Sequence, residues 1–379
     1  MGSRRKHALK QLNSLSYWVM QLARDDASGE NGGPQPMQDK KAALAAGPTI
    51  SGSQTKPTLK TIAKISGLAV PTVSRALNDA PDIGQDTKKL IRKIADEIGY
   101  VPNRAGVRLR TGRTNVISLI MSTEHDNHTA RLISSVAGGL EGTRYHLNVT
   151  PYAPSGDIMK PVRYVVETES ADAVILNQIE PQDPRVSYLM ERKFPFATHG
   201  RSDWADQHPY YDFDNEIYGR QAMDLLHTRG RKHVAVVAPP LRQSYALHLV
   251  AGLRDRAQAN GQHLFILDNV TSDSPNDVVA SGVTAHIGAH PQTDAIITAS
   301  TGAALAAVAG LEAAGHTVGR ETDVFAKEAV PFLKLVRSDI LTMAESVGSA
   351  GDFLAKAAIQ AIRHPELPPM QCLEVPTTA

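Results

Sequence analysis

The sequence of 379 residues contains a single cysteine, Cys372. One thiol cannot form an internal disulfide or a multi-thiolate metal site, which is typical of a protein from a reducing compartment. The chain also lacks any apolar run approaching about 18 residues, the length needed for a membrane-spanning helix. We therefore expect a cytoplasmic protein that has no membrane partner.

Motifs of several common enzyme classes are absent as well. The sequence has no phosphate-cradling G-x-x-x-x-G-K-[ST] loop, no H-E-x-x-H metal helix and no G-x-S-x-G nucleophile elbow. Gly138, Gly139 and Gly142 lie within a helical pattern rather than directly after a strand, so they do not form a dinucleotide fingerprint. The 14 histidines show no metal-ligand spacing. We expect no enzyme activity, no catalytic residues, no cofactor and no bound metal.

Charge is nearly balanced over the whole chain, with a formal net charge of +1, but it is distributed unevenly. Residues 56–114 contain 12 Lys and Arg against 5 Asp and Glu, whereas residues 115–379 contain 21 against 30. A basic segment followed by a mildly acidic body is typical of a nucleic-acid-binding module fused to a ligand-binding or regulatory domain. A solvated helical surface is the alternative interpretation of the basic segment.

Residues 1–55 predict a disordered N-terminal extension, because glycine, proline, serine and glutamine follow one another there without periodicity. Ser3-Arg4-Arg5 before a short apolar patch is the one hint of a twin-arginine export signal. Polar residues interrupt that patch and no small-residue cleavage site follows it, so we do not expect export.

Three short helical runs follow from Thr58. Their apolar positions repeat at helical spacing: Leu59, Ile62 and Ala63; Val73, Ala76 and Leu77; and Leu90, Ile94 and Ile98. The first run ends at Gly67 and the third at Gly99, where a glycine commonly terminates a helix. The tight connection between the first two runs predicts a helix-turn-helix, whose second helix enters the major groove of DNA.

Beyond residue 115 the pattern predicts alternating strands and helices. Apolar strands are expected to begin at Val116, Ala171, His233 and Asp294, with amphipathic stretches between them. This alternation is typical of parallel sheets with helical crossovers, and the length fits two such halves better than one. Ligands in such folds bind at the carboxyl ends of the strands, in the cleft.

Three motifs carry a specific resemblance to a known family. They are T-V-S-R-A-L-N at 72–78, G-Y-x-P-N at 99–103 and L-R-T-G-R-T at 109–114. With them, residues 58–120 resemble the lactose-repressor (LacI/GalR) family of transcriptional regulators. Weaker motifs, D-F-D-N-E-x-x-G at 212–219 and R-G-R-K-H-V-A-V-V at 229–237, are similar to the effector domain of that family. The chain as a whole faintly resembles the family's regulators of α-glucoside use.

Composition and the resemblance together predict four parts. These are a disordered extension over 1–55, a helix-turn-helix DNA-binding domain over 56–101, a hinge helix and linker over 102–114, and a two-lobed effector-binding and dimerisation domain over 115–379. The last part would have a periplasmic-binding-protein type I fold built on parallel sheets. The implied partners are double-stranded operator DNA, a small-molecule effector and a second copy of the chain.

Twelve residues are the predicted DNA contacts. They are Thr58, Leu59, Val70, Pro71, Thr72, Ser74, Arg75, Asn78, Asn103, Arg104, Arg108 and Leu109. Thr72, Ser74 and Asn78 can donate to phosphate oxygens, whereas Arg75 can fork onto a guanine edge, worth roughly 1–3 kcal/mol of discrimination. The alternative for Arg75 is an ion pair with Asp79, four residues on.

Two departures from the family pattern weaken helices in the DNA-binding part. Ala69 stands where the family usually has a serine N-cap, at a cost of about 1 kcal/mol. Gly106 weakens the expected hinge helix, which is already too short to be stable in water. In the family that the chain resembles, a leucine of the hinge helix enters the minor groove at the centre of the operator, and Leu109 is the matching residue. We therefore expect the hinge to fold only when two copies pair on kinked DNA. An ordinary linker is the alternative.

The effector domain departs further from the family. Ser300-Thr301 replaces the usual Asn-Asp, and Phe325-Ala326-Lys327 replaces Gly-Phe-Asp, so a standard monosaccharide pocket cannot be transferred. Nine residues near expected strand ends are the predicted effector contacts: His199, Arg201, Asp203, Trp204, Asp214, Tyr245, His248, Lys327 and Glu345. Carboxylates and Trp204 favour a sugar, whereas Lys327 with Arg201 would favour an anionic sugar derivative.

The sequence thus predicts a homodimeric, ligand-controlled repressor of carbohydrate-use genes that binds a palindromic operator. Two other functions stay open at this point. One is a sugar-binding protein without a DNA role, and the other is a sugar-active enzyme.

Overall fold

A computed structural model describes residues 56–101, 108, 112–122, 127–153 and 156–376. The expected extension over 1–55 and most of the expected hinge lie outside these residues. The chain divides into two compact units, with the boundary between Ile98 and Gly99.

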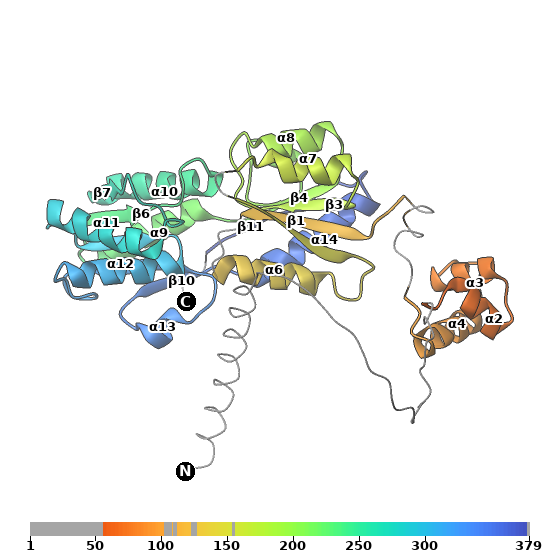
Figure 1. The fold of residues 1–379 in the computed structure, drawn as a ribbon. Helices are drawn as coiled ribbons and strands as arrows, with labels where there is room; N and C mark the ends of the chain where they lie inside the picture. The colour runs from red at the N-terminus through yellow and green to blue at the C-terminus, as the bar shows by residue number, and fades with distance from the viewer. Residues whose placement is uncertain (1–55, 102–107, 109–111, 123–126, 154–155, 377–379) are drawn as a thin grey trace, which may run out of the picture. The chain divides into compact units, whose positions relative to one another are not determined.

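The first unit consists of three short helices around a small core. These are α2 (Leu59–Ser66), α3 (Val70–Leu77) and α4 (Gln85–Glu97), as Figure 1 shows. Ile62, Val73, Ala76 and Ile91 are fully buried between them. Gly67 ends α2 with a φ of 71°, a left-handed conformation that glycine adopts without steric cost, and Gly99 follows α4 with a φ of 64°. The three predicted helices and both glycine stops are confirmed.

One predicted core position in this unit is wrong. Leu90 is 48% exposed, and α4 instead buries Ile91, Ile94 and Ala95. The predicted row of every fourth residue drifts around a helix by about 40° per step, because four residues exceed one turn of 3.6 residues. Leu90 therefore lies off the face that Ile94 presents to the core.

The second unit contains two parallel sheets. The first has the strand order β11-β5-β4-β3-β1-β2 and the second has the order β10-β9-β8-β6-β7. The first sheet comprises β1 (Val116–Ser122), β2 (His146–Tyr152), β3 (Ala173–Leu176), β4 (Phe196–His199), β5 (Tyr210–Phe213) and β11 (Gln371–Glu374). The second comprises β6 (His233–Val237), β7 (His263–Ile266), β8 (Ala295–Thr298), β9 (Asp323–Glu328) and β10 (Leu341–Ala344). The four predicted strands and the two halves are confirmed.

Helices cover both faces of each sheet (Figure 1). On the first sheet, α6 (Asn127–Gly139) and α14 (Val347–Arg363) cover one face, and α7 (Met159–Glu167) and α8 (Pro184–Glu191) cover the other. On the second sheet, α9 (Asn215–Thr228) and α10 (Ser244–Asn260) lie opposite α11 (Asn276–Ala289) and α12 (Thr301–Ala313). Because both faces are covered, the central strands β1, β3, β6 and β8 are mainly apolar and buried, whereas the edge strand β2 carries only exposed and half-buried residues.

The close packing of α9 against α10 explains one glycine. A Cβ at Gly252 on α10 would overlap the backbone of Glu216 on α9. Only glycine allows the two helix backbones to approach this closely.

The chain passes between the two sheets from β5 into α9, and again from β10 into α14. These two connections define two lobes, one around each sheet. Residues at the carboxyl ends of strands from both lobes can therefore share a site. No helix among the described residues is long and apolar enough to span a bilayer.

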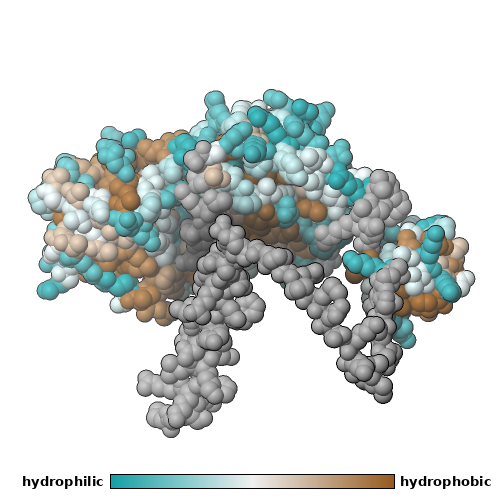
Figure 2. All heavy atoms as spheres, in the orientation of Figure 1, coloured by the Kyte–Doolittle hydropathy of each residue, from teal (hydrophilic) through white to brown (hydrophobic). Residues whose placement is uncertain are grey.

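The surface of the second unit is mixed. Hydrophilic residues dominate over α7 and α8, whereas hydrophobic surface gathers at α13 (Leu333–Val336), as Figure 2 shows. The exposed fractions of Leu335 and Val336 on α13 are 87% and 64%.

Candidate functional site

The helix α3 begins without a side-chain cap. Its N-cap residue Ala69 makes no capping hydrogen bond, and Pro71 stands in the first turn, where its missing amide hydrogen costs nothing. At the other end, Asn78 Nδ2 donates to the Ser74 carbonyl oxygen at 2.6 Å. The uncapped start expected from the sequence is confirmed.

The predicted DNA contacts of this unit lie on two helices. Thr58 and Leu59 stand at the start of α2, and the others lie along α3 or at its end. The Thr58 hydroxyl accepts from the Thr61 amide at 3.4 Å within a capping box, so it already stabilises α2. Val70, Thr72 and Ser74 are half-buried and Pro71, Arg75 and Asn78 are exposed.

Arg75 is held by an exposed ion pair. Its partner is Asp82, and the alternative partner Asp79 instead pairs with Arg92. The side chains of Arg75 and Asp82 are 55% and 47% exposed. Exposed ion pairs contribute about 0–1 kcal/mol. Asp82 therefore orients the guanidinium of Arg75, and breaking this ion pair would cost little free energy.

The hinge residues Asn103, Arg104 and Leu109 lie outside the described residues. Arg108 is described, and its guanidinium donates to the Thr168 carbonyl oxygen at 2.8 Å and lies 3.8 Å from the Glu169 carboxylate. The segment that follows is fixed by Asp172, which accepts from the Thr114 amide and hydroxyl and from the Asn115 amide at 2.7–2.9 Å. Asp172 thus anchors the chain directly before β1.

In the second unit, a pocket lies at the carboxyl ends of strands from both lobes. Its lining residues are Ser122, Tyr152, Ile158, Gln178, Glu180, Arg185, Arg242 and Gln243. Ser122 and Tyr152 end β1 and β2, whereas Arg242 and Gln243 follow β6 in the other lobe. Two contacts join the lobes here: Arg242 lies 3.4 Å from Glu180, and the Ser244 amide donates to the Ile179 carbonyl oxygen at 2.8 Å.

Several buried polar atoms in or beside this pocket lack hydrogen-bond partners among the described residues. They are Asn177 Oδ1, Arg185 Nη1, and both Nε2 and Oε1 of Gln243. Arg185 is 1% exposed and its charge is balanced by the buried Asp183, at 2.6 Å. A buried polar atom without a partner costs about 1–3 kcal/mol, so these atoms indicate a place for a hydrogen-bonding ligand.

None of the nine predicted effector contacts lines this pocket. Lys327 is buried, its Nζ lies 3.0 Å from Glu345 Oε2, and it donates to Asn215 Oδ1 at 3.2 Å. The ammonium also lies over the rings of Phe213 and Tyr245, at 5.1 and 5.5 Å from their centroids. Lys327, Tyr245 and Glu345 are therefore brought together, beside the connections between the lobes.

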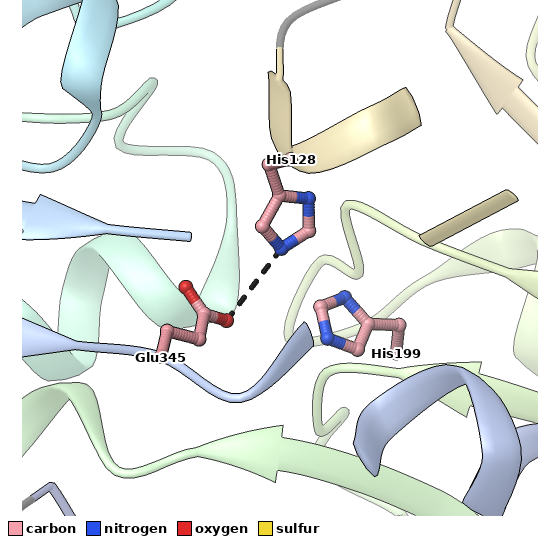
Figure 3. Close-up of side chains that lie close together, drawn as sticks. All are labelled: His128, His199 and Glu345. Carbon is pink, nitrogen blue, oxygen red and sulfur yellow. Dashed lines mark ion pairs between the residues drawn. The ribbon is translucent and has the colours of Figure 1, made fainter. Parts of the chain in front are cut away.

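His199 belongs to the same group. It lies with His128 and Glu345, and His128 Nε2 is 3.5 Å from Glu345 Oε1 (Figure 3). Burial, with the charge of His128 beside it, lowers the pKa of His199 to about 3. Burial alone would raise the pKa of Glu345, but Lys327 and His128 hold it below its ordinary value, so the carboxylate is charged.

The other predicted effector contacts have separate surroundings. Arg201 donates to Asp212 at 2.8 Å, and burial raises the pKa of Asp212 to about 6 despite that bond. Asp214 caps α9 by accepting from the Ile217 amide at 3.0 Å. Trp204 packs on the core beneath α7 and α8, whereas Asp203 is exposed. Burial lowers the pKa of His248.

Sequence reasoning missed the pocket residues and His128. Ser122, Tyr152, Gln178, Arg185 and Gln243 carry no motif, and each becomes part of a site only because parallel strands end at one edge. The rule that ligands bind at the carboxyl ends of strands indicates the edge where this pocket lies. It could not choose among the residues there.

Comparison with family models gives two matches. Residues 58–103 match the model of bacterial regulatory proteins of the LacI family. Residues 148–366, more than half of the chain, match the model of periplasmic binding proteins and the sugar-binding domain of the LacI family.

The chain belongs to the LacI family of bacterial regulatory proteins. It is a ligand-responsive, DNA-binding transcriptional regulator, with the helix-turn-helix over α2 and α3 and the ligand domain in the second unit. The predicted family, fold and general function are confirmed.

This LacI-family regulator is similar to several characterised proteins. It is 28% identical to the transcriptional regulator AglR of Rhizobium meliloti (strain 1021), over 80% of this chain and 87% of AglR. It is also 28% identical to the transcriptional regulator CelR of Thermobifida fusca, over 71% of this chain and 81% of CelR. These relatives are transcriptional regulators.

Solved structures show the same fold. The lac repressor dimer bound to operator and an anti-inducer has a TM-score of 0.72 at 17% identity, covering 85% of this chain and 97% of the other. The CelR–cellobiose complex has a TM-score of 0.62 at 22% identity, and the match covers 85% of this chain and 98% of the CelR chain.

Proposed function

We propose that this regulator is a cytoplasmic repressor of carbohydrate-use genes that binds a palindromic operator as a homodimer and responds to a neutral sugar. The observation that carries the sugar assignment is the pocket between the lobes, with its unpartnered Arg185, Gln243 and Asn177 atoms. A sugar presents many hydroxyl groups, each able to donate and accept, and so matches a site of mixed donors and acceptors.

The charges around the pocket favour a neutral ligand over an anionic one. Arg185 is balanced by Asp183, and Arg242 lies beside Glu180. Lys327 and Arg201, the two cations that suggested a phosphate or carboxylate, are paired with Glu345 and Asp212. An anion would have to compete with these carboxylates. Tyr152, at the end of β2, lines the pocket and supplies an aromatic side chain for contact with a sugar ring.

The relatives support this proposal. CelR has been solved with cellobiose, and the lac repressor has been solved as a dimer on its operator. The exposed Leu335 and Val336 on α13 add hydrophobic surface that a second copy of the chain can cover.

The route from pocket to DNA runs through the hinge. A sugar that contacts residues of both lobes changes their relative orientation, and Asp172 fixes the linker to the first lobe. Arg108 would exchange its bond with Thr168 for the DNA backbone when the hinge folds on the operator. A coupling of about 1–3 kcal/mol would change operator affinity by about 5- to 150-fold.

The test is a gel-shift series with the full chain and a duplex selected by it from random sequences. Neutral mono- and disaccharides are compared with sugar phosphates and sugar acids. We expect one neutral sugar to release the DNA and a steep dependence of affinity on salt. Release by charged derivatives alone would contradict the neutral-sugar assignment, and no DNA binding at all would contradict the regulator itself.

A pair of glutamine variants locates the effector. Gln243→Ala should weaken sugar affinity by about tenfold or more, because it removes donors and acceptors buried in the pocket. Gln221 on α9 also has a buried, unpartnered oxygen but does not line the pocket, so Gln221→Ala is the matched control. Isothermal titration calorimetry measures both, and equal losses would place the sugar elsewhere.

The hinge proposal has its own variant. Leu109→Ala should reduce binding to the selected duplex far more than binding to random DNA, because a wedge acts only at the central kinked step. Equal reductions would remove the proposed role of Leu109.

We also propose that the protein does not convert its sugar. Chromatography of the sugar after incubation with the protein checks this.

A further inference from the structure

Three side chains from distant parts of the chain meet beside the connections between the lobes. His128 lies at the start of α6, His199 ends β4, and Glu345 directly follows β10. Figure 3 shows the three pointing toward one another, and one ligand atom of each lies within 4.8 Å of the others. Among the described residues this is the only such group of three.

We propose that His128, His199 and Glu345 bind a divalent transition-metal ion of the Zn²⁺ type. Two imidazoles with one carboxylate are a ligand set that zinc uses when it keeps one further position open. Ligand atoms around a tetrahedral Zn²⁺ lie about 3.3 Å apart, given metal–ligand bonds of about 2.0–2.1 Å. The 3.5 Å between His128 Nε2 and Glu345 Oε1 is already close to this spacing, and a ligand atom of His199 lies within 4.8 Å of a ligand atom of each.

A second observation supports the site independently of the spacing. Nε2 of His199 is buried and has no hydrogen-bond partner among the described residues. An orphaned imidazole nitrogen in the interior is costly, and a metal ion would satisfy it. Imidazole ligands also favour zinc and its neighbours over Mg²⁺ and Ca²⁺, which prefer oxygen ligands.

Lys327 is placed to support the carboxylate rather than to replace the ion. Its Nζ lies 3.0 Å from Oε2 of Glu345, whereas Oε1 faces His128. One carboxylate oxygen can therefore bind metal while the other is held by the ammonium. Partners of this kind commonly orient metal-binding carboxylates. Lys327 is thus a positioning residue for Glu345.

The position of the site predicts what the ion would do. Glu345 belongs to the connection from β10 to α14, whereas His128 and His199 belong to the first lobe. A bound ion would tie that connection to the first lobe. The proposed metal site goes beyond the proposed response to a sugar, because binding of the ion requires neither sugar nor DNA.

The experiment uses the full chain, freed of metal by chelation and titrated with ZnCl₂ in a calorimeter. We expect one strong site, with weak or no binding of MgCl₂. His128→Asn should reduce the affinity of that site by at least about a hundredfold, since losing even an outer partner commonly costs 10- to 100-fold. Glu345→Gln should do the same, and the melting temperature without metal checks that each variant folds. A wild type without a strong site, or a His128→Asn variant that keeps it, would overturn the proposal.

Two other histidine pairs provide matched controls. His233 with His263, and His286 with His290, each have ring centroids 4.8 Å apart but no third ligand among the residues that the structure describes. His263→Asn and His290→Asn should leave the strong site unchanged, and loss of the strong site in either would assign it to that pair. Visible absorption of bound Co²⁺ should disappear in His128→Asn. The sugar-dependent gel shift is read separately, so failure of the metal site and failure of the regulator can be told apart.

Discussion

The two units of this regulator use charge in opposite ways. In the DNA-reading unit, residues 56–98, every cation except Lys88 is exposed, and its ion pairs lie at the surface. In the sensor unit, residues 112–376, charged side chains such as Arg185, Asp323 and Lys327 are buried, and each contacts a group of opposite charge.

The difference follows from what each unit contacts. A protein that binds phosphates gains by releasing counterions, so its cations have to stay accessible. A domain that binds a ligand between two lobes needs fixed groups in its interior, and buried charges are fixed only when they are paired. Removing one partner of a buried charge pair in the sensor unit should therefore cost several kcal/mol of stability, whereas removing an exposed charge in either unit should cost about 1 kcal/mol or less.

The largest effect is expected at Asp323. Its buried carboxylate accepts from Arg229 at 2.7 and 3.0 Å and from Arg231 at 2.8 Å. Asp323→Asn leaves two guanidinium groups without their anion and should lower the free energy of unfolding by about 3 kcal/mol.

The matched control for Asp323 is Asp224, which makes an equally close bidentate pair with Arg256 but is 41% exposed. Asp224→Asn should cost no more than about 1 kcal/mol. Urea unfolding measures both variants. If the two losses were equal, burial would not be what separates the roles of charge in this protein.

A smaller effect should appear in the pH dependence of stability. Burial raises the pKa of Asp212 to about 6 in the folded protein, above its unfolded value of about 3.9. Its contribution is fully present below about pH 4 and is lost as the pH rises through 6. Relative to Asp212→Asn, the wild type should lose roughly 2 kcal/mol of stability between pH 4 and pH 7.

Urea titrations of both proteins across this range provide the measurement. Asp203→Asn, at an exposed carboxylate two residues from Arg201, is the control for removal of a nearby surface charge. A constant difference between wild type and Asp212→Asn would show that the buried carboxylate stays charged throughout.

The smallest effect concerns the uncapped helix of the DNA-reading unit. Ala69→Ser gives α3 the hydroxyl cap that it lacks and should stabilise the helix by about 1 kcal/mol. Hydrogen exchange of the α3 amides should slow by about fivefold. Gly84, the N-cap of α4, also lacks a side-chain cap, and Gly84→Ser controls for a cap outside the recognition helix. Unchanged exchange in Ala69→Ser would mean that α3 is held by packing alone.

Much of the fold could be predicted because its signals are local. β1 and β6 are short apolar runs, and such runs are what a doubly covered parallel strand requires. Gly67 and Gly99 occupy left-handed positions that end helices. The prediction that Leu90 belongs to the core was wrong, because the spacing of three apolar residues did not distinguish the core face of α4 from the face beside it.

The candidate sites could be predicted only in part. Lys327 and Glu345 were identified as chemical groups at strand ends, and they do meet. Their histidine partner His128 and the pocket residue Gln243 had no local signal. They become neighbours of other groups only through the order of strands in each sheet, which pairs segments far apart in the sequence.

The hydrogen bonds from Thr114 and Asn115 to Asp172 also limit the distance between the three-helix unit and the first lobe. Sixteen peptide steps separate Ile98 from Thr114, and a fully extended chain spans at most about 3.3–3.6 Å per residue. Whatever conformation the intervening residues adopt, Ile98 at the end of the three-helix unit therefore lies within about 55 Å of Thr114. In the proposed homodimer, the second three-helix unit would therefore search for its half-site only within a small volume once the first has bound DNA.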